Sequence, residues 1–278
     1  MDRFSLKNKT AIVTGSSRGI GRAIAVAYAR AGARVVITSR KADACRAVVD
    51  QIKTEGLEAM AIPCNISSKE QIHALVDQTE AAYGPADVLV CNAAVNPYYG
   101  PMSEIPDDAF AKVLDVNIRS NLWLVNRVAP GMAKRGGGSV VIISSIAGLT
   151  GSRVLGAYAI SKAADMQLAR NLALEWGKQG VRANCIAPGL VKTDFAKALW
   201  DTPAGTEVPI GRNLELRGLE PRLQIPGLAG LSQGPGFANL GALGLLSNRV
   251  LQPLLRGRAA RKELGDGQGM EYKSLLFE

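Results

Sequence analysis

From residue 9 to about 190, the chain alternates short runs rich in β-branched residues with longer segments of helical periodicity. Six almost continuously apolar runs lie at 10–14, 33–39, 58–63, 87–92, 138–145 and 181–189. Five segments that have helical periodicity and end in glycine lie at 19–32, 42–56, 68–84, 107–136 and 156–180. Strands of this kind are typical of a parallel sheet that is covered on both faces. The pattern therefore predicts an α/β fold in which right-handed crossovers build a doubly wound parallel sheet.

The last part of the chain has a different composition. Residues 201–278 hold 13 of the 30 glycines but only four Val or Ile residues, so a closing strand is not expected there. We expect 206–236 to be rich in loops and a short helix to lie at about 238–251. The predicted organisation is one domain over residues 1–200, followed by an atypical, poorly ordered C-terminal segment over 201–278.

The composition argues against several kinds of site. The net charge is +9, but the basic residues are spread along the chain and alternate with acids, which favours an anionic small ligand over nucleic acid. His73 is the only histidine, so neither a Ser-His-Asp triad nor a multi-histidine metal site is expected. The cysteines show no CxxC spacing, and we expect reduced thiols and no bound metal at Cys45, Cys64, Cys91 and Cys185.

The hydropathy of the chain indicates where the protein is located. No apolar run approaches the roughly 20 residues that span a bilayer, and the first residues lack the apolar segment of a secretory signal. We therefore expect a cytoplasmic protein that does not bind membranes.

The stretch TGSSRGIG, residues 14–21, follows the first predicted strand directly and opens the first predicted helix. Gly15 permits a tight turn, Gly19 and Gly21 permit close approach of the backbone, and the helix N-terminus presents N–H groups. In this position the stretch predicts a pyrophosphate site of a dinucleotide, the alternative being turn chemistry alone. The expected contacts are Gly15, Ser17, Arg18, Gly19, Ile20 and Gly21.

The ends of the next strands predict which dinucleotide binds. Ser39, Arg40 and Lys41 follow the second strand, where an acidic residue usually binds the ribose 2′-OH of NAD. Cations at this point suit a 2′-phosphate and favour NADP(H) over NAD(H), although they also suit a solvated helix start. After the third and fourth strands we expect further cofactor contacts at Asn65, Ile66, Asn92, Ala93 and Ala94.

Three polar residues are predicted to share a catalytic site. Ser145 ends the fifth strand, and Tyr158 and Lys162 lie one turn apart on the next helix, so all three fall at the carboxyl edge of the sheet. A lysine cation, together with a positive nicotinamide ring, is expected to lower the pKa of the Tyr158 phenol from about 10 towards the working range. Asn117 is a candidate support for a proton-relaying water, or simply a polar residue that distorts its helix.

Taken together, these motifs resemble the short-chain dehydrogenase/reductase family. The likeness covers residues 5–200 and is carried in order by TGSSRGIG, CNAA, Asn117, Ser145, YAISK and APGLVKTDF. The segments NAAVNPYYG and RGGGSVVIISSIAG are similar to the carbonyl-reductase-like branch that includes the dehydrogenase/reductase member 4 group. After Trp200 we find no counterpart of the last helix and closing strand that family members usually have.

The resemblance implies a Rossmann-type sheet in a single domain and a tetrad of Asn117, Ser145, Tyr158 and Lys162. It implies that Tyr158 is the acid/base, that Ser145 polarises the carbonyl and that Lys162 also binds the nicotinamide ribose. Further implied cofactor contacts are Pro188, Gly189, Val191 and Thr193. It also implies a homodimer or homotetramer, built on the helices at 107–135 and 156–178.

The leading hypothesis is an NADP(H)-dependent oxidoreductase that interconverts a carbonyl and a secondary alcohol by hydride transfer. Its small-molecule substrate is expected to have an apolar face, since the pocket candidates are Tyr98, Tyr99, Leu155, Leu190, Phe195 and Trp200. The alternative is a homologue that binds the cofactor but is catalytically impaired, because a missing last strand leaves a sheet edge exposed.

Overall fold

The computed structural model describes residues 5–200, which belong to two compact units. The first holds residues 5–189 and 193–195, and the second includes residues 190–192 and 196–200. The sheet and the helices from α1 to α6 all lie in the first unit, whereas the short helix α7 (Lys197–Trp200) lies in the second. The segment expected to be atypical, 201–278, with its helix at about 238–251, lies outside the described residues.

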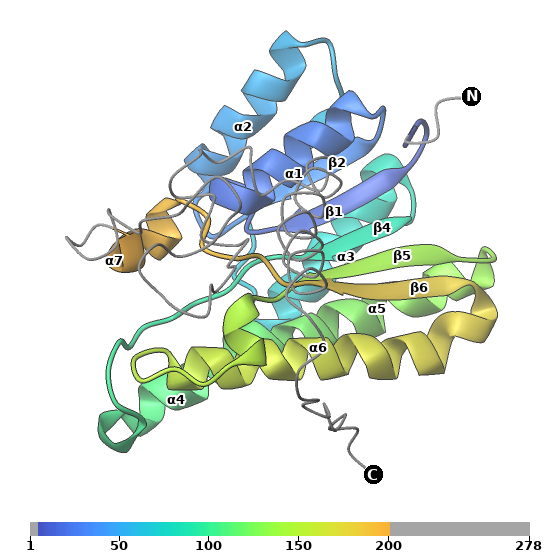
Figure 1. Ribbon diagram of the computed structural model, residues 1–278. Helices are drawn as coiled ribbons and strands as arrows, with labels where there is room; N and C mark the ends of the chain where they lie inside the picture. The colour runs from blue at the N-terminus through green and yellow to red at the C-terminus, as the bar shows by residue number, and fades with distance from the viewer. Residues whose placement is uncertain (1–4, 201–278) are drawn as a thin grey trace, which may run out of the picture. The chain divides into compact units, whose positions relative to one another are not determined.

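The core of the first unit is a parallel sheet of six strands (Figure 1). The strands are β1 (Thr10–Thr14), β2 (Arg34–Thr38), β3 (Ala59–Ala61), β4 (Val88–Cys91), β5 (Gly138–Ile143) and β6 (Val181–Ile186). They lie in the order β3-β2-β1-β4-β5-β6, and every pair is parallel. The order in which strands are added to the sheet reverses between β1 and β4, which confirms the prediction of a doubly wound sheet. A crevice at the carboxyl ends of these two strands is the usual ligand position in such folds.

Helices cover both faces of this sheet. They are α1 (Gly19–Arg30), α2 (Ala42–Thr54), α3 (Lys69–Tyr83), α4 (Asp107–Leu114), α5 (Ser120–Lys134) and α6 (Gly156–Trp176). Alternate strand residues face opposite layers: Val13 packs with the buried residues of α1 and α2, whereas Ile12 packs with those of α3, α5 and α6. Figure 1 shows α1 and α2 on one side of the strands and α3, α5 and α6 on the other. Burial on both faces explains why the strands read as continuous apolar runs.

The segment 107–136, expected to be one helix, contains a π-helical stretch, Asp115–Arg119, between α4 and α5. Side chains of this region compete for backbone carbonyl groups. Ser120 donates to the Val116 oxygen at 2.6 Å, and Asn121 donates to the Asn117 oxygen at 2.7 Å. Such bonds disturb the regular i→i−4 ladder and are a known cause of π-turns and bends. The irregular stretch carries the predicted site residue Asn117.

The two edge strands of the described sheet are β3 and β6. Among residues 5–200, β6 pairs only with β5. Its alternate residues Arg182, Asn184 and Ile186 are exposed, whereas Val181 is buried against the helices of the other face.

Candidate active and cofactor site

The structure brings three of the predicted catalytic residues together beyond the carboxyl end of β5. Ser145 follows β5 and caps the short helix η3 (Ile146–Leu149), with its hydroxyl accepting from the Ala147 amide at 3.1 Å. Tyr158 and Lys162 lie in the first two turns of α6. The Ser145 side chain lies close enough to the Tyr158 phenol to lower its pKa, and the Lys162 ammonium lies 5.6 Å from the centre of the tyrosine ring. A hydroxyl, a phenol and an ammonium therefore lie close together beyond the end of β5.

Burial dominates the acidity of the phenol. Desolvation raises the pKa of Tyr158 to about 12, the hydrogen bond with Ser145 acts in the opposite direction, and the nearby Asp165 carboxylate raises the pKa further. The sequence predicts that the Lys162 ammonium, together with a positive nicotinamide ring, lowers this pKa, and the structure shows how the ammonium is engaged within the chain. The ammonium makes a 2.9 Å ion pair with Asp165, which offsets its charge at the phenol. In this structure the Tyr158 phenol is therefore held in its protonated form.

Lys162 is buried and firmly held. Its ammonium donates to the Ile143 carbonyl oxygen at 2.8 Å and to Asp165 Oδ2 at 2.9 Å, and the residue is only 2% exposed. Ser144 adds a 2.6 Å bond from its hydroxyl to the Lys162 carbonyl oxygen. These bonds fix the turn of α6 that carries Lys162 to the end of β5.

The Asn117 side chain is fully buried and joins the loop after β4 to α6. Its Oδ1 accepts from the Val95 amide at 2.8 Å, and its Nδ2 donates to the Val95 oxygen and the Ser161 hydroxyl, both at 3.0 Å. The structure therefore places Asn117 near the other three residues through Ser161. All of its observed side-chain bonds are to Val95 and Ser161, so it acts as a brace between two elements that border the site.

The glycine-rich turn has the geometry of a phosphate cradle. Gly15 and Gly19 have φ of 64° and 55°, and a Cβ on Gly21 would lie 2.5 Å from the Gly15 oxygen, so each position requires glycine. Residue 18, the N-cap of α1, makes no side-chain capping bond, which leaves the first N–H groups of the helix open to a ligand. The open N-terminus and the close turn fit a pyrophosphate.

Two residues that we did not predict hold this turn in place. Thr14 Oγ1 accepts from the amides of Asn92 and Ala93 at 2.9 and 3.0 Å, and so links β1 to the loop after β4. Ser16 is buried and accepts from the Thr38 amide at 2.9 Å, which links the turn to the end of β2. Only their position in the sequence could have predicted this role. Small hydroxyl residues between a strand and a glycine turn are well placed to form hydrogen bonds with the ends of neighbouring strands.

The predicted Asn92 also serves the turn. Its Nδ2 donates to the backbone carbonyl oxygens of Thr14 at 2.8 Å and of Gly15 at 3.3 Å. The Cα of Ala93 lies 3.0 Å from the position of a Cβ on Gly15, so a small residue at 93 matches the close approach. Ala94, next in the loop, is half-buried.

The cations predicted to recognise a 2′-phosphate lie on the surface near this crevice. Arg18, Arg40 and Lys41 are exposed, and none of them forms an ion pair with an acidic residue in the part of the chain that the structure describes. Ser39 is engaged locally, with its hydroxyl 3.1 Å from Cys45 Sγ. The end of β2 therefore presents cationic and hydroxyl groups without a competing carboxylate.

The other predicted cofactor contacts have mixed placements. Asn65 Oδ1 accepts from the Ser67 amide at 3.2 Å in a turn, and the Ile66 side chain is buried in the core. The Pro188 oxygen accepts from the Ile146 amide at 3.0 Å, which ties the segment after β6, including Gly189, to the turn that holds Ser145. Thr193 lies 3.5 Å from the position of a Cβ on Gly19. Val191 belongs to the second compact unit.

Two aromatic residues lie near Tyr158. The rings of Tyr158 and Phe195 lie 6.0 Å apart, and Tyr99 is close enough to raise the pKa of Tyr158. Tyr98 turns its hydroxyl to the Pro101 oxygen at 3.1 Å, and Leu155 is half-buried. Leu190 and Trp200 lie in the second unit. The side of the site that faces Tyr158 is thus partly apolar.

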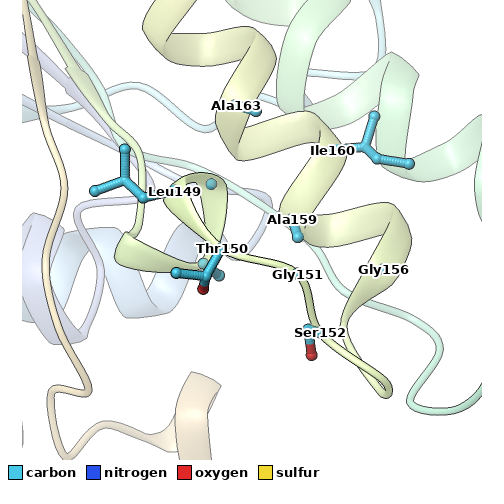
Figure 2. A pocket seen from close by; sticks show the side chains of 10 residues that line it. Leu149, Thr150, Gly151, Ser152, Gly156, Ala159, Ile160 and Ala163 are labelled. Carbon is cyan, nitrogen blue, oxygen red and sulfur yellow. The ribbon is translucent and has the colours of Figure 1, made fainter. Parts of the chain in front are cut away.

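A separate surface pocket of about 440 Å³ lies between the segment after Ser145 and the start of α6 (Figure 2). Its lining residues are Ala147, Gly148, Leu149, Thr150, Gly151, Ser152, Gly156, Ala159, Ile160 and Ala163. None of Ser145, Tyr158 and Lys162 lines it, so this pocket is not the place where the three reactive groups meet.

The remaining expectations concern metals, thiols and membranes. No group of three or more His, Cys, Asp or Glu side chains that could hold a metal occurs among residues 5–200, and His73 is exposed on α3. All four cysteines are free thiols, and three of them are buried. Within the same described range, no helix is both long and apolar enough to cross a membrane.

Comparison with known proteins agrees with this geometry. The profile of the short chain dehydrogenase family matches residues 9–204. Bovine dehydrogenase/reductase SDR family member 4 is 44% identical over 205 residues, which cover 74% of each chain.

Two solved structures are similar over most of their length. A 7α-hydroxysteroid dehydrogenase complexed with NADH and 7-oxo glycochenodeoxycholic acid is 39% identical, with a TM-score of 0.69 over 72% of this chain and 78% of that one. A gluconate 5-dehydrogenase from Burkholderia cenocepacia in complex with NADP and tartrate is 31% identical, with a TM-score of 0.70 over 74% and 80%.

The fold, the site and these similarities define the class of protein: it is an NAD(P)-dependent oxidoreductase that acts on CH–OH or C=O groups. The chain belongs to the short-chain dehydrogenase/reductase family and resembles its member 4 branch.

Proposed function

We propose that this protein is an NADP(H)-dependent oxidoreductase that interconverts a carbonyl and a secondary alcohol, with Tyr158 as the acid/base. The observation that carries the proposal is that Ser145, Tyr158 and Lys162 lie close together at the carboxyl edge of a doubly wound sheet, the edge that also carries the glycine turn.

When bound, the nicotinamide supplies or accepts a hydride. The chain's own residues handle the proton and the orientation. The Ser145 hydroxyl holds the substrate oxygen, and Tyr158 gives its phenolic proton to that oxygen in reduction or takes it back in oxidation. Burial favours the protonated phenol, which is the form that donates a proton in reduction, whereas oxidation requires the phenolate.

The charges at the end of β2 support NADP(H) as the cofactor. Arg40 and Lys41 are exposed without acidic partners in the described structure, and Arg18 lies in the glycine turn. A 2′-phosphate would make charge-assisted hydrogen bonds with these groups. The two similar structures named above contain NADH and NADP respectively, so the preference rests on this chain's own cations.

The aromatic side of the site supports a substrate with an apolar face. Phe195 and Tyr99 lie close to Tyr158. Ketones, quinones and steroids all have this property, and a similar dehydrogenase is complexed with an oxo-steroid acid. We propose carbonyl compounds of this kind as the first substrates to screen.

The proposal is tested by Tyr158→Phe. General acid–base catalysis contributes about 10²- to 10⁴-fold, so turnover should fall by at least about 10²-fold. NADPH affinity, measured by fluorescence titration, should stay within about threefold, because the phenol is not expected to bind the phosphates. Retained turnover in the variant would show that another group transfers the proton.

A second candidate function is cofactor binding without efficient catalysis. It is favoured by the sequence after residue 200, whose four Val and Ile residues offer little for a further strand beside β6. Turnover and cofactor binding of the full chain separate the two candidates. Tight NADPH binding with no reduction of any carbonyl in the screen would support the second one.

Assembly and location complete the proposal. We propose a homodimer or homotetramer that uses the helices at 107–135 and 156–178, because large apolar side chains are exposed there: Leu122, Ile160 and Leu174. We also propose a cytoplasmic location, which is compatible with four free thiols. Detection of the protein in the membrane fraction or in an exported form would contradict this location.

A further inference from the structure

A carboxylate that we did not predict is completely buried beside the catalytic lysine. Asp165 lies on α6, three residues after Lys162, and is 0% exposed. Its Oδ2 lies 2.9 Å from the Lys162 ammonium, and both side chains are enclosed. Carboxylates are almost never fully buried unless they are paired. The Lys162–Asp165 ion pair is therefore a buried part of the site and not a solvated surface contact.

Among the described residues, one positively charged group faces Asp165, the Lys162 ammonium. The Asn121 amide also contacts the carboxylate. The charge of Asp165 adds to burial in raising the pKa values of three nearby groups: the Tyr158 phenol and the thiols of Cys91 and Cys185. Burial raises the pKa of the Asp165 carboxyl, and the Lys162 ammonium acts against that effect. Each member of the pair is thus the charge that balances the other.

Asn121 fixes the orientation of the carboxylate. Its Nδ2 lies 2.7 Å from the Asn117 carbonyl oxygen, which can only accept, so this atom must be the amide nitrogen. The same nitrogen donates to Asp165 Oδ1 at 3.0 Å. Asn121 Oδ1 has no partner among the described residues, although it is buried. The Asn121 amide nitrogen therefore donates a hydrogen bond to the carboxylate, while the Asn121 amide oxygen accepts none from the residues that the structure describes.

Two hydrogen-bonded pairs join the π-helical stretch and the start of α5 to α6. Asn117 bonds Ser161, and Asn121, one turn further along, bonds Asp165, one turn further along α6. The first pair lies beside Tyr158, whose backbone carbonyl oxygen accepts from the Ser161 hydroxyl at 2.7 Å. The second holds Lys162 through Asp165. The irregular stretch between α4 and α5 is thereby connected to both catalytic residues of α6.

The bonds of the ammonium leave room for one further acceptor. A lysine ammonium has three N–H donors, and here one points to Ile143 and one to Asp165. We propose that Asp165 is a positioning residue, which directs the Lys162 ammonium so that its third N–H is presented to the cofactor. This inference rests on the proposed function, since it assigns the remaining donor to the ribose of the bound dinucleotide.

The test is a double-mutant cycle of the full-length protein: wild type, Asp165→Asn, Lys162→Met and the double variant. If Asp165 acts through Lys162, Asp165→Asn should lower kcat by about tenfold and weaken NADPH binding by about threefold or more, while KM for the carbonyl stays within about twofold. In the Lys162→Met background, the same change should alter kcat and NADPH affinity by less than about twofold.

Thermal unfolding gives a readout that needs no turnover. Lys162→Met leaves a buried carboxylate without its opposite charge, so its Tm should fall, and adding Asp165→Asn should recover part of the loss. Glu175→Gln, which removes an exposed carboxylate from the same helix, is the matched control and should leave kcat, NADPH affinity and Tm unchanged. If Asp165→Asn does not fold, Asp165→Ser removes the charge without crowding its neighbours and takes its place in the cycle.

Equal losses from Asp165→Asn in both backgrounds would overturn the proposal and give Asp165 a purely structural role. Unchanged kcat and NADPH affinity in the single variant would overturn it as well. Absence of turnover in the wild type is a failure of the proposed function and not of this inference, because the coupling in Tm and in NADPH affinity still decides it.

Discussion

At Tyr158, burial and charge act in opposite directions, and burial dominates. Desolvation raises the phenol's pKa to about 12, and the lysine one turn away cannot reverse this because Asp165 balances its charge. A neutral phenol suits proton donation in reduction and must first lose its proton to act as a base in oxidation. The two directions of the reaction should therefore respond differently to pH.

For alcohol oxidation, we expect kcat to rise between pH 7 and pH 9. The fraction of phenolate increases up to about tenfold per pH unit below its pKa. For carbonyl reduction, kcat should be nearly constant between pH 6 and pH 8, since the phenol stays protonated. Stopped-flow or steady-state rates at saturating cofactor and substrate give both profiles. An oxidation rate that is flat from pH 7 to pH 9 would mean that bound cofactor lowers the pKa of Tyr158 below this range.

Residue spacing was enough to place Ser145, Tyr158 and Lys162 in one site, because strand ends and helical turns have fixed geometry. It did not show how strongly burial and Asp165 raise the phenol's pKa. The depth of burial depends on packing, and the only sequence signal for Asp165 is its spacing of three residues from Lys162. A carboxylate three residues from a lysine is usually a solvated pair.

The turn from β2 into α2 is the element that should decide between the two dinucleotides. Removing both cations with Arg40→Ala and Lys41→Ala should raise the Kd for NADPH by about 10- to 100-fold, because each charge-assisted bond is worth about 1.5 to 3 kcal/mol before solvation losses. The Kd for NADH should change by less than about threefold. Fluorescence titrations with both cofactors measure the two values.

The control for this change is Arg46→Ala on α2. Arg46 is exposed and already paired with Asp43, so it should not contribute to recognition of a 2′-phosphate. Equal weakening of NADPH and NADH in the Arg40 and Lys41 variant would contradict their assignment as readers of that phosphate.

The irregular stretch Asp115–Arg119 is the second informative element. Asn117→Ala removes the partners of the Val95 amide and carbonyl and one partner of Ser161, so we expect a loss of about 2–4 kcal/mol in the free energy of unfolding. Ser161→Ala breaks only one of these bonds and should cost about 1 kcal/mol. Urea unfolding followed by circular dichroism compares them. If both variants lose the same amount, Asn117 does not brace the loop after β4.

The periodicity predicted the helices well, but not the π-turn within 107–136. Helical periodicity reports which face is apolar, and α4 and α5 share that pattern across the irregular stretch. Two sets of hydrogen bonds accompany the π-turn. Ser120 and Asn121 donate to backbone carbonyl groups within it, and the Asn117 side chain bonds the Val95 amide and carbonyl across the site. The second set involves residues far apart in the chain.

At the scale of the whole molecule, the exposed apolar residues of α6 should determine assembly. Leu174 is 82% exposed, and burial of a leucine contributes about 1.5–3 kcal/mol on each side of a symmetric interface. We therefore expect Leu174→Glu to shift the molecular mass measured by light scattering towards that of the monomer.

The control is Leu149→Glu. Leu149 is 66% exposed but lies in η3, outside the helices proposed to form the interface. An unchanged mass in the Leu174 variant, or equal dissociation in the Leu149 variant, would place the interface elsewhere.

The sequence alone was sufficient to predict the parallel sheet, the glycine turn and the group of Ser145, Tyr158 and Lys162. These features follow from local periodicity and from the rule that parallel strands bring their carboxyl ends to one edge. Tertiary structure decided which charge offsets the Lys162 ammonium, which side chains brace the turn, and how strongly the Tyr158 phenol holds its proton. These depend on distances between residues such as Asn121 and Asp165, which are far apart along the chain, and on the removal of water when the helices pack.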